Sequence, residues 1–269
     1  MGGATEADLI RLATLLSMSV TIGFARMYGF TFVFPLFGWM EVRGPLRFAI
    51  AFGLSVPSIV AVHGLLQAAP ALTPGGWVAL VVKEAVVGAL LGGLYGLPFW
   101  AIQGVGDMVE VYRGASAANL FDPVHAQETS IGGKFLIMLA LVLFVALGGV
   151  ADCAELMLAS YRSWRALEFL PLMDWAALRG LGAVIGRGLT LAVVLGAPLV
   201  LVLLLVDVAL IFAVRSARSF QINDLNHAAR GLMLLLVLPV FVTLFGAHLG
   251  PQLRALLLAM RAALGLGAG

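Results

Sequence analysis

The stretch AVVGALLGGLYGLPFWAIQGVG, residues Ala85 to Gly106, decides the fold of this chain. It contains no charged residue, and a helix needs about 20 apolar residues to cross the hydrocarbon core of a bilayer. Gly88, Gly92 and Gly96 recur every fourth residue, which gives one side of such a helix a smooth ridge for close packing. We therefore predict a membrane helix here, with a second helix packed against its glycines.

The rest of the chain is equally apolar. It is 62% hydrophobic and 11% charged, whereas an ordinary globular domain carries roughly 25% charged residues. We therefore expect an all-α protein with about six membrane-spanning helices, surrounded by lipid or by other protein. The remaining long runs without Asp, Glu, Lys or Arg are residues 48–82, 135–151, 188–206 and 231–253, and Arg26 alone interrupts residues 12–40.

The distribution of Lys and Arg does not predict an orientation. These residues usually accumulate in short cytoplasmic loops. With six spans, each side of the membrane would receive seven of them, and Arg26 and Lys83 would lie inside apolar segments. Either the assumed spans are wrong, or the segments do not form a conventional bundle.

Four charges lie in or beside the apolar segments: Arg26, Lys83, Glu84 and Asp207. Charged groups at that depth normally face protein or water. Adjacent residues on a helix point about 100° apart, so Lys83 and Glu84 should not pair well with each other. We expect each of the four to contact another helix or another subunit. Mutual neutralisation of Lys83 and Glu84 near a membrane surface is the alternative.

Prolines interrupt several apolar segments. Pro57 should kink or break its helix, and Pro198 and Pro239 should interrupt the last two segments. Those two segments form a predicted hairpin with a basic, amide-rich tip, residues 215–230. His63 is a single histidine in an apolar run, and we expect it to be a hydrogen-bonded interior group.

No enzyme site is evident. Ser116 lies in a loose G-x-S-x pattern, and His227 and His248 follow it as in intramembrane serine proteases, but nothing indicates an oxyanion hole. The histidines are scattered, which argues against a metal centre, and there is no Walker-type phosphate loop. We expect no catalytic residue, cofactor or metal. A small-molecule secondary transporter remains an alternative, because intramembrane charges and helices broken at proline occur in such proteins.

The order of these features resembles the flagellar export-gate protein FliR and its injectisome counterpart, called SctT, YscT, SpaR or HrcT. FARMYGFTFVFPLFG and VRGPLRFAIAFGLS carry the first part of the likeness. The strongest part is KEAVVGALLGGLYGLPFWAIQGVGDMVEVYRGASAANLFDP, followed by QETS. FQIN and NHAARG resemble the family's hairpin tip, although Phe220 stands where the family usually has proline.

This resemblance implies a subunit of a type III secretion export gate in the bacterial inner membrane, within the basal body. One such subunit joins five SctR-type and four SctS-type subunits, and contacts an SctU-type switch protein. The fold would consist of bent helical hairpins in a helical, pore-forming assembly through which unfolded proteins pass. Residues 1–187 would be SctR-like and residues 188–269 SctS-like. We favour the injectisome over the flagellum.

The resemblance also implies two functional segments. The loop after the central helix would plug the closed pore, and its small residues suit tight packing at an axis; a plain exposed turn is the alternative. The tip of the last hairpin, including Arg218, Gln221, Asn223 and Arg230, would face the cytoplasm. The predicted plug comprises Tyr112, Arg113, Gly114, Ala115, Ser116, Ala117, Ala118, Asn119 and Leu120.

Overall fold

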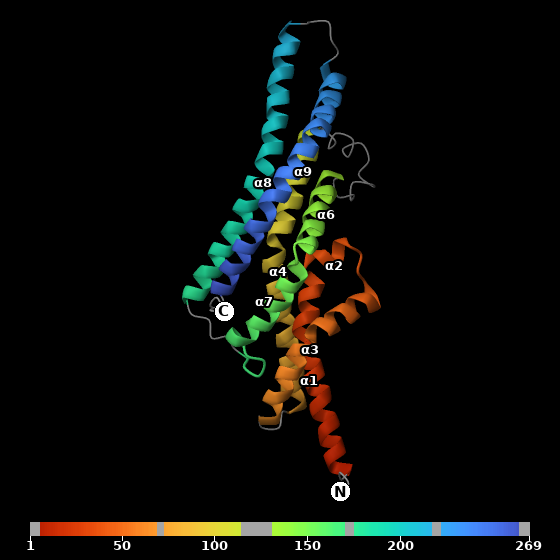
Figure 1. Ribbon diagram of the computed structural model, residues 1–269, viewed down its shortest axis with the longest axis vertical. Coiled ribbons are helices and arrows are strands. Elements are labelled where there is room, and N and C mark those ends of the chain that lie inside the picture. Colours follow the sequence, from red (N-terminus) through yellow and green to blue (C-terminus); the bar gives the residue numbers. More distant parts are fainter. Residues whose placement is uncertain (1–5, 69–72, 114–130, 170–174, 217–221, 264–269) are drawn as a thin grey trace. The chain divides into compact units, whose positions relative to one another are not determined.

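The structure, a computed structural model, consists of helices joined by short connections in the part of the chain that it describes (Figure 1). That part comprises residues 6–68, 73–113, 131–169, 175–216 and 222–263. The helices are α1 (Glu6–Val33), α2 (Pro35–Trp39), α3 (Gly44–Ala68), α4 (Pro74–Arg113), α6 (Ile131–Ala146), α7 (Gly149–Ser163), α8 (Trp175–Ser216) and α9 (Ile222–Ala263).

Five of these helices are long and apolar enough to cross a membrane. They are α1, α3 and parts of α4, α8 and α9, and the number rises to six if α6 and α7 count as one broken span. The prediction of an all-α membrane protein is therefore confirmed. With 40 residues in α4 and 42 each in α8 and α9, these helices are about 60 Å long. That length is about twice the thickness of the hydrocarbon core.

Helices continue through prolines that we expected to interrupt them. Pro57 lies inside α3, Pro198 inside α8, and Pro239 inside α9. A proline inside a helix removes one backbone hydrogen bond, and membrane helices tolerate this loss where neighbouring groups satisfy the freed carbonyl. α3 does not end at Pro57, so the predicted break there is wrong.

Helix ends occur where the local backbone favours them. α4 begins at Pro74, where the missing N–H costs no hydrogen bond, and the Thr73 hydroxyl accepts a hydrogen bond from the Gly76 N–H at 3.2 Å. α6 and α7 are separated at Gly148, whose φ of 87° is left-handed. Glycine adopts that conformation without the steric penalty of a Cβ.

The chain forms two compact units, and neither is a continuous stretch. The first comprises residues 1–96, 148–184 and 257–269, and the second comprises residues 97–147 and 185–256. α4, α8 and α9 each contribute to both. The division at residue 187 that the resemblance implies is a different one, and it stays a prediction.

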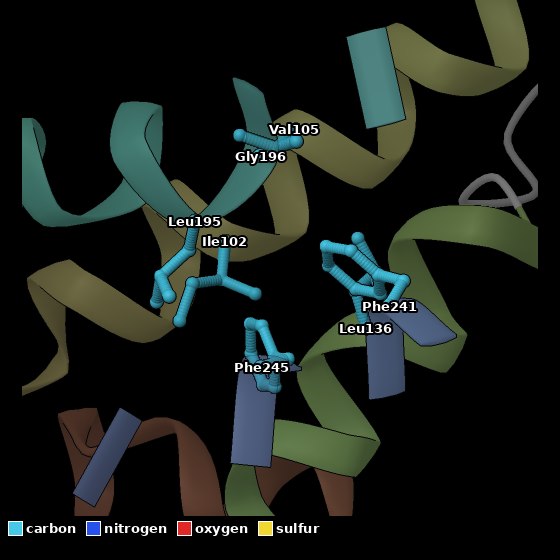
Figure 2. Close-up of a pocket in the computed structure, with 7 residues that line it drawn as sticks. All are labelled: Ile102, Val105, Leu136, Leu195, Gly196, Phe241 and Phe245. Atoms are coloured by element: carbon cyan, nitrogen blue, oxygen red, sulfur yellow. The ribbon is translucent and has the colours of Figure 1, made fainter. Parts of the chain in front are cut away.

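Each unit has its own apolar core. In the first, α1, α3, α4 and the segment after α7 bring together Ile22, Val62, Leu66, Leu80 and Ala166. In the second, side chains from α4, α6, α8 and α9 converge, as Figure 2 shows. Phe241 and Phe245 of α9 are 3% and 2% exposed there. A Cβ at Gly196 would overlap the Val105 side chain, so this glycine allows α8 to approach α4 closely.

Much apolar surface is left uncovered by the chain itself. Large hydrophobic side chains recur every fourth residue on the exposed sides of α4 and α9. Contiguous apolar stripes of this kind need lipid or another protein to cover them. The residues are Val78, Val82, Val86 and Leu90 on α4, and Leu232, Leu236, Val240 and Leu244 on α9.

Candidate functional site

Three of the four predicted intramembrane charges meet in the first unit. Arg26 on α1 and Glu84 on α4 form a two-point ion pair: the Nε–Oε2 distance is 2.5 Å and the Nη2–Oε1 distance is 3.0 Å. The Lys83 Nζ lies 2.5 Å from Oε1 of the same carboxylate, the oxygen that the Arg26 Nη2 also contacts. The side chains of Arg26 and Glu84 are 1% and 0% exposed. We call Arg26, Lys83 and Glu84 the buried charge cluster.

The prediction that Lys83 and Glu84 would not pair well, because they are adjacent on a helix, is wrong. The Lys83 side chain is long enough to bring its ammonium to the Glu84 carboxylate, so the two neighbours pair. The expectation that these charges contact another helix is met within the chain, since Arg26 on α1 pairs with Glu84 on α4.

The end of α7 completes the surroundings of the cluster. Arg26 donates to the Ser160 hydroxyl and to the Trp164 carbonyl, both at 2.8 Å. Its guanidinium lies 3.7 Å from the centre of the Tyr161 ring, a distance at which a cation and an aromatic face attract each other. Arg26 therefore joins α1 to both α4 and α7.

Lys83 contacts the segment that follows α7. Its ammonium donates to the carbonyls of Arg165, Ala166 and Glu168 at 3.0, 2.9 and 3.0 Å. Two cations thus share one carboxylate, and the excess positive charge faces carbonyl oxygens. Removing one member of a buried ion pair costs about 3–5 kcal/mol, because the remaining charge stays buried without compensation.

Two of the predicted packing glycines lie against α1. A Cβ at Gly88 would overlap the carbonyl oxygen of Arg26, and a Cβ at Gly92 would lie 2.6 Å from that of Phe30. Gly96 is buried. The sequence reasoning did not identify Gly29, the matching position on α1, where a Cβ would overlap the Ala85 carbonyl oxygen.

The other predicted charge and the lone histidine lie elsewhere. Asp207 is half-buried on α8, in the second unit. His63 is hydrogen-bonded through both ring nitrogens, to the Ser19 hydroxyl at 3.0 Å and to the Gln67 amide at 3.0 Å. The prediction of a hydrogen-bonded histidine is confirmed, although the side chain is half-buried and not fully interior.

Most of the predicted plug and part of the predicted hairpin tip lie outside the described residues. Tyr112 and Arg113 are the last two residues of α4, and the rest of the predicted plug falls in residues 114–130. Arg218 and Gln221 also fall outside, whereas Asn223 and Arg230 belong to α9. Both segments stay predictions.

The contacts of the buried charge cluster link α1, α4 and the end of α7 to one another. Its polar atoms contact one another and the end of α7, and its carboxylate is fully buried. Within the described ranges, no group of three or more His, Cys, Asp or Glu residues is placed to hold a metal ion. The sequence reasoning missed Ser160, Tyr161 and Trp164, because their segment, between α6 and α8, showed only an amphipathic, mixed-charge pattern.

Comparison with known proteins identifies relatives over most of the chain. The chain is 33% identical to the surface presentation of antigens protein SpaR of Salmonella typhimurium, over 71% of this chain and 70% of that protein. It is 27% identical to the Yop proteins translocation protein T of Yersinia pestis, over 67% and 68%. It is 26% identical to the flagellar biosynthetic protein FliR of Pectobacterium carotovorum, over 84% and 86%. Residues 17–256 match the family described as bacterial export proteins, family 1, and the chain belongs to that family.

Proposed function

We propose that this protein is a subunit of the export gate of a type III secretion system. The observation that carries the proposal is the family match over residues 17–256. The chain is an inner-membrane protein of the secretion apparatus, as its relatives and its five apolar helices indicate. It acts by forming part of a conduit for unfolded proteins, and its role is structural rather than enzymatic.

The injectisome is the better assignment of the two related machines. Identity to SpaR is 33%, compared with 26% for the flagellar protein of Pectobacterium. A secretion apparatus protein, SsaT of Salmonella typhimurium, is also 26% identical. A flagellar role is the second candidate, since the match to the flagellar relative covers more of the chain, 84% against 71%.

Within the gate, we propose one copy of this chain with five SctR-type and four SctS-type subunits, in contact with an SctU-type protein. Exposed apolar stripes support a subunit covered by other helices as well as by lipid. Helices of about 60 Å also exceed what a bilayer of about 30 Å covers when they stand upright. Tyr112–Leu120 plugs the closed pore, and the tip of the α8–α9 hairpin faces the cytoplasm.

Purification from the native membrane tests this function. A tagged chain, extracted in mild detergent, should bring with it two smaller membrane proteins, and native mass measurement should give one complex with the proposed five and four copies. The same chain alone in liposomes should move no small solute. Recovery of a single protein that transports a solute would support the transporter and contradict the export gate.

A further inference from the structure

The buried charge cluster also holds the end of α7. We propose that Arg26 and Lys83 are positioning residues, which Glu84 orients and which together fix the α7 exit (Trp164–Glu168). Through α7 they also hold the base of the C-terminal hairpin, meaning the start of α8 and the end of α9. The inference rests on the proposed function for what that hairpin does in the export gate. The contacts themselves lie within the first unit.

The first step concerns the carbonyls at the end of α7. The carbonyls of the α7 exit lie beyond Ser163, the last residue of α7, and a buried carbonyl outside a helix still needs a hydrogen-bond donor. Here Arg26 donates to the Trp164 carbonyl, while Lys83 donates to those of Arg165, Ala166 and Glu168. Ala166 is 1% exposed, so solvent has little access to that part of the segment. The two cations therefore donate hydrogen bonds to the backbone of a non-helical segment, bonds that water would supply if the segment were exposed.

The second step concerns why cations stand at this place. The C-terminal end of a helix carries a partial negative charge, which favours Lys and Arg nearby. A lysine ammonium has three donors, and a guanidinium has a planar fork of five. Lys83 shares its three donors among four acceptors, the three carbonyls and the Glu84 carboxylate. Arg26 divides its fork between Glu84, Ser160 and Trp164. Each position therefore suits its own residue, and exchange of Lys for Arg would not preserve the contacts.

The third step connects α7 to the last hairpin. Glu155 on α7 pairs with Arg261 near the end of α9 at 3.1 Å. Close to that pair, the start of α8 contacts the end of α9: a Cβ at Gly180 would lie 2.8 Å from the Ala263 Cβ. α7, whose end the cluster holds, thus also makes an ionic contact with the end of α9, two residues before Ala263, where α9 meets the start of α8.

Labelling of single cysteines in the full chain tests the proposal. The chain would be expressed with its partner subunits in a Cys153→Ala background, with a reporter cysteine at Ala166 in the α7 exit or at Ala51 in α3. These two positions are 1% and 0% exposed. Lys83→Met should raise the rate of maleimide labelling at position 166 by about tenfold or more, as expected for local opening, and leave the rate at position 51 within about twofold. Lys134→Met, which makes the same change at an exposed lysine of α6, should alter neither rate.

A second measurement follows the base of the hairpin. A single cysteine placed at Ala263, which is half-buried against Gly180, should be labelled about threefold faster or more in the Lys83→Met variant, since opening of the α7 exit frees its contacts. If Lys83→Met does not accumulate, Lys83→Arg serves instead. It keeps the charge but changes the donor geometry, so it should raise the labelling rate at position 166 and leave the rate at position 51 unchanged.

Two results would overturn the proposal. Unchanged labelling at position 166 would show that the cluster does not hold the α7 exit, and equal increases at positions 166 and 51 would show general support of the fold. Labelling needs neither export nor partner binding to be read. A chain that failed to co-purify with partner subunits would contradict the proposed function and leave this test intact.

Discussion

The carbonyl oxygen of Arg26 occupies the space that a side chain at Gly88 would fill, so α1 and α4 touch backbone to backbone. This contact lies one helical turn from Glu84, the residue that binds the Arg26 guanidinium. The ion pair therefore depends on the glycine, because a side chain at position 88 would keep α1 too far from α4 for the two-point pair to form.

Gly88→Ala should destabilise the protein for this reason. Alanine normally favours a helix over glycine by about 1 kcal/mol, but overpacking at a tight contact costs about 1–3 kcal/mol. The loss should appear as a lower unfolding midpoint in a denaturing-detergent titration. Gly53→Ala in α3 is the matched control, because a Cβ there meets nothing within 4 Å, and it should be neutral or stabilising. Equal midpoints for the two variants would contradict the packing argument.

Glu84→Gln should be more damaging than any substitution of a surface carboxylate. It leaves Arg26 and Lys83 buried side by side without their shared anion, and loss of one partner from a buried pair costs about 3–5 kcal/mol. Glu155→Gln, at an exposed pair on α7, should cost about 1 kcal/mol or less. The amount of folded chain after expression without partner subunits measures the difference. If Glu84→Gln lowers only the yield of the assembled complex, its main partners are in other subunits.

Arg26→Lys should lower the stability of the protein even though it keeps the positive charge. A lysine cannot make the two-point contact with Glu84 while also reaching Ser160 and Trp164. We expect a loss of about 1–3 kcal/mol, the cost of leaving a buried hydrogen-bonding group unsatisfied, measured by the same titration. The half-exposed Arg261 pair provides the control, and Arg261→Lys should change the midpoint little. A wild-type midpoint for Arg26→Lys would mean that charge alone suffices.

Deletion of Gly114–Ala118 tests the predicted plug. The shortened chain should still assemble with its partners, because the deletion spares every contact of the buried charge cluster, but cells should leak small ions and dyes across the inner membrane. Dye uptake, with a native gel of the same membranes to show assembly, measures both effects. An assembled complex in a tight membrane would leave the plug without support.

The helical membrane fold was predictable, since runs without charge as long as Ala85–Gly106 have few other solutions in lipid. The family was also predictable from the block around residues 83–123, and the match over residues 17–256 confirms it. Periodicity placed Gly88 and Gly92 on one side of α4, where α1 lies. These features depend on local sequence, which is why the sequence reveals them.

The pairing within the charge cluster was not predictable in the same way. Arg26 and Glu84 lie 58 positions apart, and Ser160 lies 134 positions from Arg26. Only the packing of three helices brings them together. The prediction for Lys83 and Glu84 was wrong because it considered only the angle of about 100° between adjacent side chains on a helix. A flexible lysine side chain is long enough to span that angle. Proline likewise marks a weak point in a helix without deciding that the helix ends there, as Pro57 shows.

The interleaving of the two units has a consequence for biosynthesis. The chain passes from one unit to the other at residues 96, 147, 184 and 256. The unit that contains residues 6–96 therefore stays incomplete until residues 257–263 have been synthesised. A premature stop before residue 257 would leave that unit unfinished, and neither unit could be exchanged between relatives as an uninterrupted cassette.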